Sequence, residues 1–294
     1  MKDRINRRKI IYGAAALLAF ALLYFGTFRT RAEKTQCREV QVVVLGDSVF
    51  ADIGELPSVP ARLPEALGKT VYNAAFGGTC TAKLETDRRL DYSKGSLSLV
   101  GLAKAICAGD FGVQRSAKIR ESNAEYFAGI IEELMTIDFD KVEVILVQQG
   151  VNDYHAGTPI GNPEDPYDEY TFLGALRTAL EALQQANPDF RIVLITPAYA
   201  WYTGTGLTCE EADQGGGILE DYVNAELALA AEMGIETIDL YHDYFPHEEW
   251  EDMWLYTMDG IHLNEAGREK VVQTIAETLD HEPDYGVGPD RQPE

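Results

Sequence analysis

The chain has 294 residues, of which 46% are hydrophobic and 25% charged, a composition typical of globular proteins that excludes a largely disordered chain. Its formal net charge is −23, and residues 35–294 alone carry 46 acidic against 17 basic side chains. Such a surface repels phosphate backbones, so we expect no nucleic-acid partner and a neutral or cationic substrate.

The N-terminus has the charge pattern of a membrane segment. Residues 1–9 include five basic side chains, and residues 10–28 form a run of 19 without a charge. As a helix rising about 1.5 Å per residue, this run nearly matches a hydrocarbon core of roughly 30 Å. We predict a cytoplasmic basic tail over 1–9, a single-pass membrane anchor over 10–28 and a linker over 29–38, with the rest of the chain outside the cell membrane. A cleaved signal peptide, which would make the protein secreted, is the alternative.

Strand-like and helix-like segments then alternate along the chain. Five apolar runs of strand length predict strands at residues 39–45, 70–73, 142–147, 191–195 and 235–240. Helical patterns lie between or after them, at residues 123–136, 170–186, 219–233 and 265–279. This alternation implies a parallel sheet with helices on both faces, in one α/β domain over residues 39–281. The remaining residues, 282–294, are rich in Pro, Gly and Asp and are predicted to be unstructured.

Cysteine and histidine spacings indicate no metal site. The chain has four cysteines, Cys37, Cys80, Cys107 and Cys209. No two are spaced as Cys-x-x-Cys, so neither a zinc site nor a redox motif is indicated, and two disulfides or buried free thiols both stay open. We therefore expect no metal and no cofactor. Four histidines without paired ligands are expected at the surface or beside the site: His155, His242, His247 and His281.

Polar segments follow the first three predicted strands. Gly-Asp-Ser occupies 46–48 after the first strand, an Asn-x-x-x-x-Gly segment occupies 73–78 after the second, and Gly-Val-Asn-Asp occupies 150–153 after the third. Ligand sites in parallel sheets form beyond the carboxyl ends of the strands, so we expect these segments to meet at one edge. A fourth polar motif, Asp-Gly-Ile-His at 259–262, lies near the C-terminus.

In this order the four motifs resemble the sequence blocks of the SGNH hydrolases, the GDSL family of esterases and lipases, over about residues 40–279. The resemblance implies a three-layer α/β/α sandwich with a flavodoxin-like five-stranded parallel sheet. It also implies a catalytic triad with Ser48 as nucleophile, His262 as general base and Asp259 as the residue that orients the imidazole. The oxyanion hole would comprise the backbone N–H groups of Ser48 and Gly78 and the side-chain amide of Asn152; Gly77 is the alternative match to Gly78.

These residue types suit ester hydrolysis. A serine hydroxyl is a poor nucleophile until a neighbouring base takes its proton, and an imidazole titrates near neutral pH. A carboxylate three residues before that histidine can hold its tautomer and stabilise imidazolium. The chain has no Gly-x-Ser-x-Gly elbow, which disfavours the α/β-hydrolase architecture.

Two aromatic segments, 198–207 and 241–256, are expected to approach the active edge. The functional interpretation is a substrate wall that stacks on a sugar or acyl chain, and ordinary burial of aromatic rings is the alternative. The candidate substrate-binding residues are Trp201, Tyr202, Trp250, Trp254 and His155.

We expect an anchored serine esterase that acts outside the membrane, through an acyl-enzyme, on short acyl groups such as O-acetyl groups on glycans. The substrate would be a small-molecule or glycan ester. An O-acyltransferase to a sugar would use the same residues, and a non-catalytic glycan-binding module is the alternative from another class. The sequence leaves the oligomeric state open.

Overall fold

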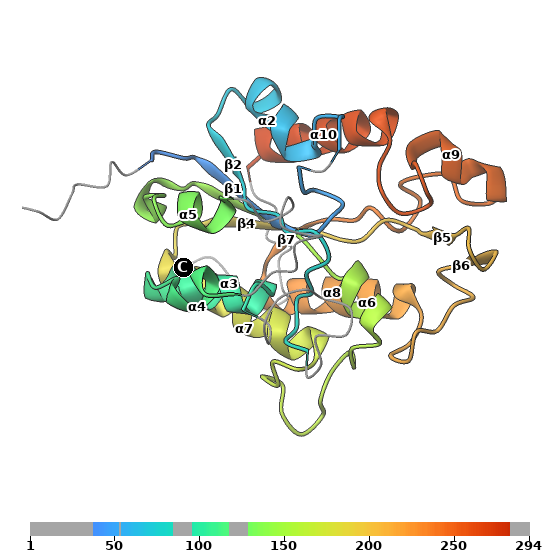
Figure 1. Ribbon diagram of the computed structural model, residues 1–294, viewed down its shortest axis with the longest axis horizontal. Coiled ribbons are helices and arrows are strands. Elements are labelled where there is room, and N and C mark those ends of the chain that lie inside the picture. Colours follow the sequence, from blue (N-terminus) through green and yellow to red (C-terminus); the bar gives the residue numbers. More distant parts are fainter. Residues whose placement is uncertain (1–37, 53, 85–95, 118–128, 283–294) are drawn as a thin grey trace, which may run out of the picture. The chain divides into compact units, whose positions relative to one another are not determined.

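The computed structural model describes residues 38–52, 54–84, 96–117 and 129–282 (Figure 1). By its internal contacts the chain divides into two units, Met1–Arg38 and Glu39–Glu294. The predicted basic tail and anchor, nearly all of the linker and nearly all of the C-terminal tail lie outside the described residues. None of the helices within those four ranges is long and apolar enough to cross a bilayer.

Five parallel strands form the central sheet. They are β1 (Val42–Gly46), β2 (Val71–Asn73), β3 (Val144–Gln148), β4 (Arg191–Ile195) and β7 (Glu236–Ile238). Their order is β2-β1-β3-β4-β7, the flavodoxin-like arrangement in which the chain starts inside the sheet and extends to both edges. The predicted five-stranded parallel sheet is therefore confirmed.

Helices cover both faces of this sheet. In Figure 1, α2 (Val59–Leu67) and α10 (Glu265–Asp280) lie above it, whereas α3 (Leu99–Ala108), α7 (Phe172–Ala186) and α8 (Leu219–Met233) lie below. This is the three-layer α/β/α sandwich expected from the sequence.

Alternate residues of β1 face two separate cores. Val42 and Val44 pack in the core beneath α2 and α10, and Val43 and Leu45 belong to the core on the other face. All four side chains are fully buried. Burial on both faces explains why the strands read as continuous apolar runs, since no position along β1 faces water. Each such side chain stabilises the fold by about 1.5–3 kcal/mol.

Helix α3 was not predicted from the periodicity of the sequence. Ser98 caps its start, with Oγ accepting a hydrogen bond from the Gly101 N–H at 3.2 Å, and Gly109 ends it with a left-handed φ of 63°. Six of its ten residues are buried, so the helix has almost no polar face. A helical period is invisible when apolar residues occupy nearly the whole circumference.

The remaining elements are short. Two lie beside the lower helices and one follows β3: α4 (Gly112–Arg115), α5 (Ile130–Leu134) and α6 (Val151–Ala156). Helix α5 falls within the predicted helix at 123–136, most of whose first half lies outside the described residues. An antiparallel hairpin and two short helices precede the C-terminal motif: β5 (Trp201–Tyr202), β6 (Leu207–Thr208), η3 (Trp250–Asp252) and α9 (Met253–Tyr256). A 3-10 turn, η2 (Phe139–Lys141), leads into β3.

The cysteines contribute packing. Cys209 is buried, its Sγ lies 3.5 Å from the Tyr241 hydroxyl, and burial raises the pKa of its thiol to about 11. Cys107 is half-buried, and neither of these two forms a disulfide with a described residue. Cys37 lies outside the described residues.

Candidate active site

The carboxyl end of β1 places Ser48 at the edge of the sheet. Gly46 is the last residue of β1, and a Cβ there would lie 3.3 Å from both the Ala75 side chain and the Gln148 carbonyl oxygen. Glycine thus lets the loops after β1, β2 and β3 approach closely. The turn that follows carries Asp47 and Ser48 out of the sheet, as the sequence motifs predicted.

Ser48, His262 and Asp259 form one hydrogen-bonded chain. Ser48 Oγ lies 3.0 Å from His262 Nε2, and His262 Nδ1 lies 2.8 Å from Asp259 Oδ2. The other carboxylate oxygen, Oδ1, accepts the backbone N–H groups of Ile261 at 3.0 Å and His262 at 2.8 Å. Both oxygens of Asp259 are therefore engaged, which fixes the plane of the imidazole and leaves its Nε2 directed at the serine.

The turn between Asp259 and His262 needs a glycine. Gly260 has a φ of 94°, in the left-handed region, and a Cβ at this position would lie 2.3 Å from the Trp201 carbonyl oxygen. The Trp201 N–H also donates a hydrogen bond to the Gly260 carbonyl at 2.9 Å. The segment that carries β5 therefore braces the Asp-x-x-His turn through its backbone.

Charges around the imidazole favour its protonated form. The hydrogen bond to Asp259 raises the pKa of His262, burial opposes the shift, and the nearby charges of Asp259 and Asp47 add to it. Partial burial would raise the pKa of Asp259, but the hydrogen bonds from His262 outweigh this and hold it below its ordinary value. Complete burial raises the pKa of Asp47 to about 7, and no donor contacts its Oδ2 within the described part of the chain.

Asn152 lies at the candidate oxyanion hole. Its Nδ2 donates to the Thr79 carbonyl at 3.0 Å, which draws the loop containing Gly78 towards the start of α6. Gly78 has a φ of 78°, and Gly77 does not share this left-handed conformation. Within the described residues, the backbone N–H groups of Ser48 and Gly78 donate no hydrogen bond. Three donors are thus available at one edge of the sheet.

Asp153 holds two of these loops together, a role that the sequence analysis missed. Its buried carboxylate accepts the backbone N–H groups of Thr81 at 2.7 Å and Ala82 at 2.9 Å. Burial raises the pKa of Asp153 to about 7, although the two backbone donors partly offset the shift. The carboxylate therefore fixes the loop after Gly78 against α6, and its place beside Asn152 in the motif was the available signal.

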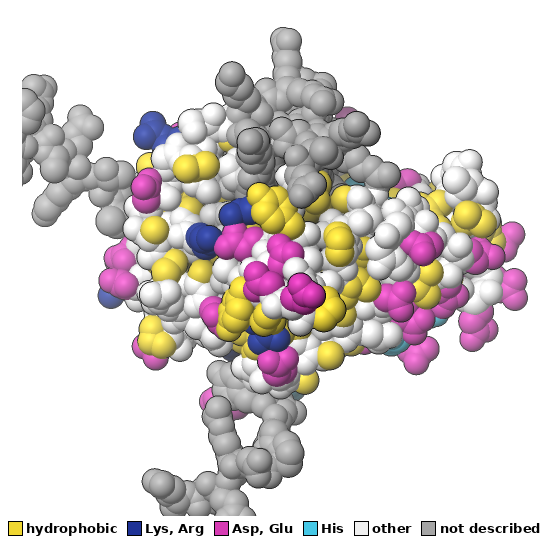
Figure 2. Space-filling model, turned by 90° about the horizontal axis from the view of Figure 1, so that it is seen from below, with side chains coloured by type: hydrophobic (Ala, Val, Ile, Leu, Met, Phe, Trp, Pro, Cys, Tyr) yellow, Lys and Arg dark blue, Asp and Glu magenta, His cyan; other side chains and the backbone are white. Residues whose placement is uncertain are grey.

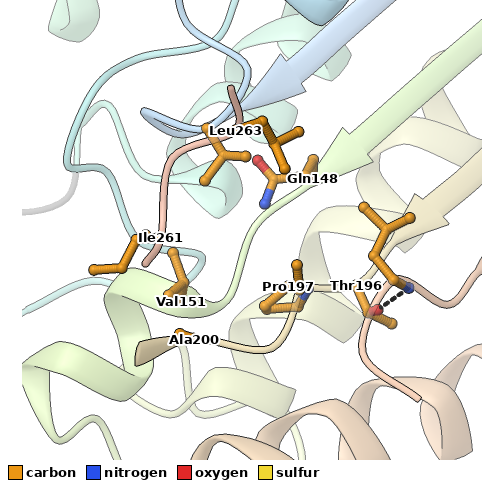
Figure 3. Close-up of a pocket in the computed structure, with 10 residues that line it drawn as sticks. Gln148, Val151, Thr196, Pro197, Ala200, Ile261 and Leu263 are labelled. Atoms are coloured by element: carbon orange, nitrogen blue, oxygen red, sulfur yellow. Dashed lines mark hydrogen bonds between the residues drawn. The ribbon is translucent and has the colours of Figure 1, made fainter. Parts of the chain in front are cut away.

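A tight apolar cavity adjoins these loops (Figure 3). It is lined by the sequence neighbours of three candidate site residues, namely Val49 next to Ser48, Val151 next to Asn152 and Ile261 next to His262. Water-sized spheres can occupy only about 10 Å³ of it, roughly the space of one water molecule. The residues at or after the ends of β3, β4 and β7, together with one that follows His262, complete the lining: Gln148, Thr196, Pro197, Ala198, Ala200, Leu240 and Leu263.

The five candidate substrate-binding residues do not form one wall. Trp201 is only 2% exposed and lines a second pocket with Trp250. Tyr202 instead pairs with His155, whose Nε2 lies 2.9 Å from the tyrosine hydroxyl. Trp254, on α9, is 54% exposed. The structure thus divides this set among three places.

A second Asp-x-x-His turn was also missed. Asp239 Oδ2 lies 2.7 Å from His242 Nδ1, and Asp239 Oδ1 accepts the backbone N–H groups of Tyr241 and His242. His242 therefore has a partner that the sequence analysis did not assign, although the motif spacing is the same as in the C-terminal one.

Sequence comparison then identifies the family. Residues 44–270 match the profile of the GDSL-like Lipase/Acylhydrolase family. The chain belongs to this family. The protein is accordingly a serine hydrolase that acts on ester bonds. Comparison with curated protein sequences gives no match.

Solved structures show the same fold. A protein from Lactobacillus plantarum is 22% identical, with a TM-score of 0.60, and the alignment covers 82% of this chain and 96% of that one. A possible lipase from Chitinophaga pinensis is 18% identical, with a TM-score of 0.52 and coverage of 82% and 98%. At these identities the likeness establishes the fold alone.

Proposed function

We propose that this member of the family hydrolyses esters of short carboxylic acids through an acyl-enzyme on Ser48. The observation that carries the proposal is the continuous chain from Ser48 Oγ through His262 to Asp259, at 3.0 and 2.8 Å. His262 Nε2 takes the proton of the serine hydroxyl as Oγ attacks the ester carbonyl carbon. Asp259 stabilises the imidazolium that results.

The negative charge formed on the carbonyl oxygen has three candidate donors. These are the backbone N–H groups of Ser48 and Gly78 and the amide of Asn152. An amide nitrogen carries two hydrogens, so Asn152 can keep its bond to the Thr79 carbonyl and still donate to the oxyanion. Each donor of this kind contributes about 2.7–4 kcal/mol to transition-state stabilisation.

Collapse of the tetrahedral intermediate breaks the ester C–O bond. His262 then returns its proton to the departing alcohol, and the acyl group stays on Ser48 Oγ. Water attacks the acyl-enzyme with His262 again as base, which releases the acid and restores the serine. No net oxidation or reduction occurs.

The cavity lined by Val49, the residue after Ser48, supports a short acyl group. Its water-sized space of about 10 Å³ leaves no room for a long chain without movement of the lining. Of the short acyl groups, we propose acetyl, carried as an O-acetyl ester on a glycan. The basic and uncharged N-terminal segments support the accompanying proposal of an anchored enzyme outside the cell membrane.

Solvent access supports hydrolysis over acyl transfer. The side chains of His262 and Asp259 are 35% and 51% exposed, so water can reach the acyl-enzyme. An acyltransferase that uses the same residues would need to exclude water from this edge.

An ester panel tests the proposal. The full chain should cleave p-nitrophenyl acetate with a higher kcat/KM than esters of eight or more carbons, and a fluorophosphonate probe should label it but not Ser48→Ala. Preference for long chains would contradict the short-acyl assignment. Failure of the probe to label the wild-type protein would favour a glycan-binding module. Release of acetate from acetylated glycan by intact cells tests the location and the substrate together.

A further inference from the structure

A second pocket lies apart from the cavity lined by Val49. Its space for water-sized spheres is about 270 Å³, and it is formed by residues 199–211 and 247–250. Ala198 and Ala200 line that cavity, whereas Tyr199 and Trp201 line this second pocket. The cavity and the second pocket thus lie on either side of one chain segment, whose alternate residues line one or the other. A ligand of the second pocket would therefore not occupy the acyl site.

Aromatic rings form a fixed wall of the pocket. The Tyr199 ring lies 4.8 Å from that of Trp201, edge to face, and stacks on His247 at 4.3 Å. Tyr199 and Trp201 are only 3% and 2% exposed, so neither ring can turn freely. Trp250 adds a half-buried ring at the rim. The face of an aromatic ring carries negative charge and attracts organic cations, and Trp250 is more accessible to one than the nearly covered Tyr199 and Trp201.

The Trp201 side chain is buried, but its indole N–H has no hydrogen-bond partner within the described residues. The side chain also lines the pocket. The nitrogen itself keeps some solvent access, so its N–H can meet water or a ligand. A ligand that carries an oxygen acceptor would satisfy it.

Four carboxylates complete the lining. They are Glu210, Glu211, Glu248 and Glu249. Within the described residues none of them forms a salt bridge with Lys or Arg. Tyr199 holds Glu210 through a hydroxyl contact of 3.3 Å, and the Thr208 N–H holds Glu211 at 2.9 Å. In Figure 2, acidic side chains gather at the end of the domain where β5, β6 and α9 lie.

The ligand class follows from these groups together. Four unpaired carboxylates favour a cation. A metal ion is the weaker candidate, because no three His, Cys, Asp or Glu side chains of the described ranges converge closely enough to hold one. Aromatic faces suit an organic ammonium, which is weakly hydrated and has an apolar surface. We propose that this pocket binds an organic ammonium ion that carries a hydroxyl or carbonyl oxygen, the class of the amino alcohols and their esters.

This inference does not rest on the proposed function, since the pocket residues are not those of the Ser48 site. The two sites share the segment 198–201, and the backbone hydrogen bond between Trp201 and Gly260 connects this segment to the Asp-x-x-His turn. Binding and ester hydrolysis can therefore be tested separately.

Calorimetric titration of the full chain with choline tests the proposal. Choline should bind at least about tenfold more tightly than its neutral isostere 3,3-dimethyl-1-butanol, because the two differ in charge and hardly in shape. Glu210→Gln combined with Glu248→Gln should weaken choline binding about fivefold or more, and Trp250→Leu should do so to a similar degree. Glu251→Gln is the matched control, because Glu251 is the sequence neighbour of Trp250 but does not line the pocket.

The outcomes separate the alternatives. Equal affinity for choline and the isostere would overturn an organic-ammonium site, and so would binding of Ca²⁺ in place of choline. No measurable choline binding would also overturn it. Ser48→Ala should abolish ester hydrolysis and leave choline affinity unchanged, so loss of one activity does not decide the other. Circular dichroism confirms that Trp250→Leu folds, and the exposed glutamate variants provide the test if it does not.

Discussion

The chain forms the same Asp-x-x-His turn twice, once from Asp239 to His242 and once from Asp259 to His262. In each, one carboxylate oxygen accepts the backbone N–H groups of the two residues that end the turn, and the other contacts the imidazole Nδ1. The Nδ1 to Oδ2 distances are 2.7 Å and 2.8 Å. Both turns therefore hold an imidazole in a fixed plane with Nε2 directed away from the carboxylate.

The two imidazoles differ in what Nε2 meets. His262 Nε2 lies 3.0 Å from Ser48 Oγ, whereas His242 Nε2 lies 3.8 Å from a carboxylate oxygen of Glu220. His242 follows β7, at an edge of the sheet, but His262 returns to the end of β1 inside the sheet. The turn alone thus orients a histidine, and proximity to the serine decides whether the histidine can act as a base.

The largest difference between the two Asp-x-x-His turns is expected when the imidazole of each is removed. We expect His262→Ala to lower kcat by about 10⁵–10⁶-fold, because serine then lacks a base. His242→Ala should change kcat less than about twofold, since its imidazole pairs with the carboxylates of Asp239 and Glu220 and not with Ser48. Steady-state hydrolysis of p-nitrophenyl acetate measures both, and a comparable loss in the two variants would refute the assignment of His262.

The next largest difference is expected when the carboxylate of each turn is replaced by an amide. Asp259→Asn should lower kcat about 10⁴-fold by favouring the wrong tautomer. It also removes the main cause of the raised His262 pKa, so the acid limb of kcat/KM should move to lower pH. In the wild type this limb should lie above about 6.5, the ordinary imidazole pKa, because activity needs the neutral base. The pH profile of Asp239→Asn should coincide with that of the wild type.

Loss of an oxyanion donor should have a smaller effect. Asn152→Ala should reduce kcat about 10²–10³-fold with little change in KM, because the donor acts on charge that develops in the transition state. Asn224→Ala is the control, since Asn224 is exposed on α8, the helix that also carries Glu220. Wild-type turnover in Asn152→Ala, with the fold intact, would exclude the amide from the oxyanion hole.

The smallest effect should be on stability. Each histidine has a further carboxylate nearby, the buried Asp47 beside His262 and the exposed Glu220 beside His242. The pKa of Asp47 is about 7 in the folded protein and about 3.9 in an unfolded chain. Between these values the unfolded state binds fewer protons, so the free energy of unfolding decreases as pH rises.

Between pH 5 and pH 8 the Tm should therefore fall less in Asp47→Asn than in the wild type. A change of about 2–4 °C is expected, which corresponds to roughly 1 kcal/mol in a domain of this size. In Glu220→Gln the Tm should fall between the two pH values by as much as in the wild type. Thermal melts at the two pH values measure this, and identical pH dependence in wild type and Asp47→Asn would show that Asp47 is ionised in the fold.

Much of this site could be predicted because its residues follow buried strands. The apolar runs of β1 and β3 are recognisable, and their carboxyl ends locate Ser48 and Asn152 without knowledge of packing. Helix α8, with its helical pattern, was predicted with the bounds that the structure has. Local patterns succeed where one short segment determines both conformation and chemistry.

The rest depends on contacts between distant segments. The role of Asp153 depends on the backbone of Thr81 and Ala82, which no local pattern links to it. The aromatic residues were grouped because they are near in sequence, but Trp201 and Tyr202 lie next to each other in β5 and contact different groups. The repeated Asp-x-x-His spacing was visible, but only the fold shows which copy reaches a serine.

The separation between Ser48 and His262 has a consequence for biosynthesis. The two partners of the 3.0 Å hydrogen bond are 214 residues apart, and His262 lies just before α10. Synthesis proceeds from the N-terminus, so a nascent chain exposes its serine long before the histidine exists. On the proposed mechanism, hydrolytic activity can thus begin only after His262 has been synthesised, and a product that ends before it would be inert towards esters.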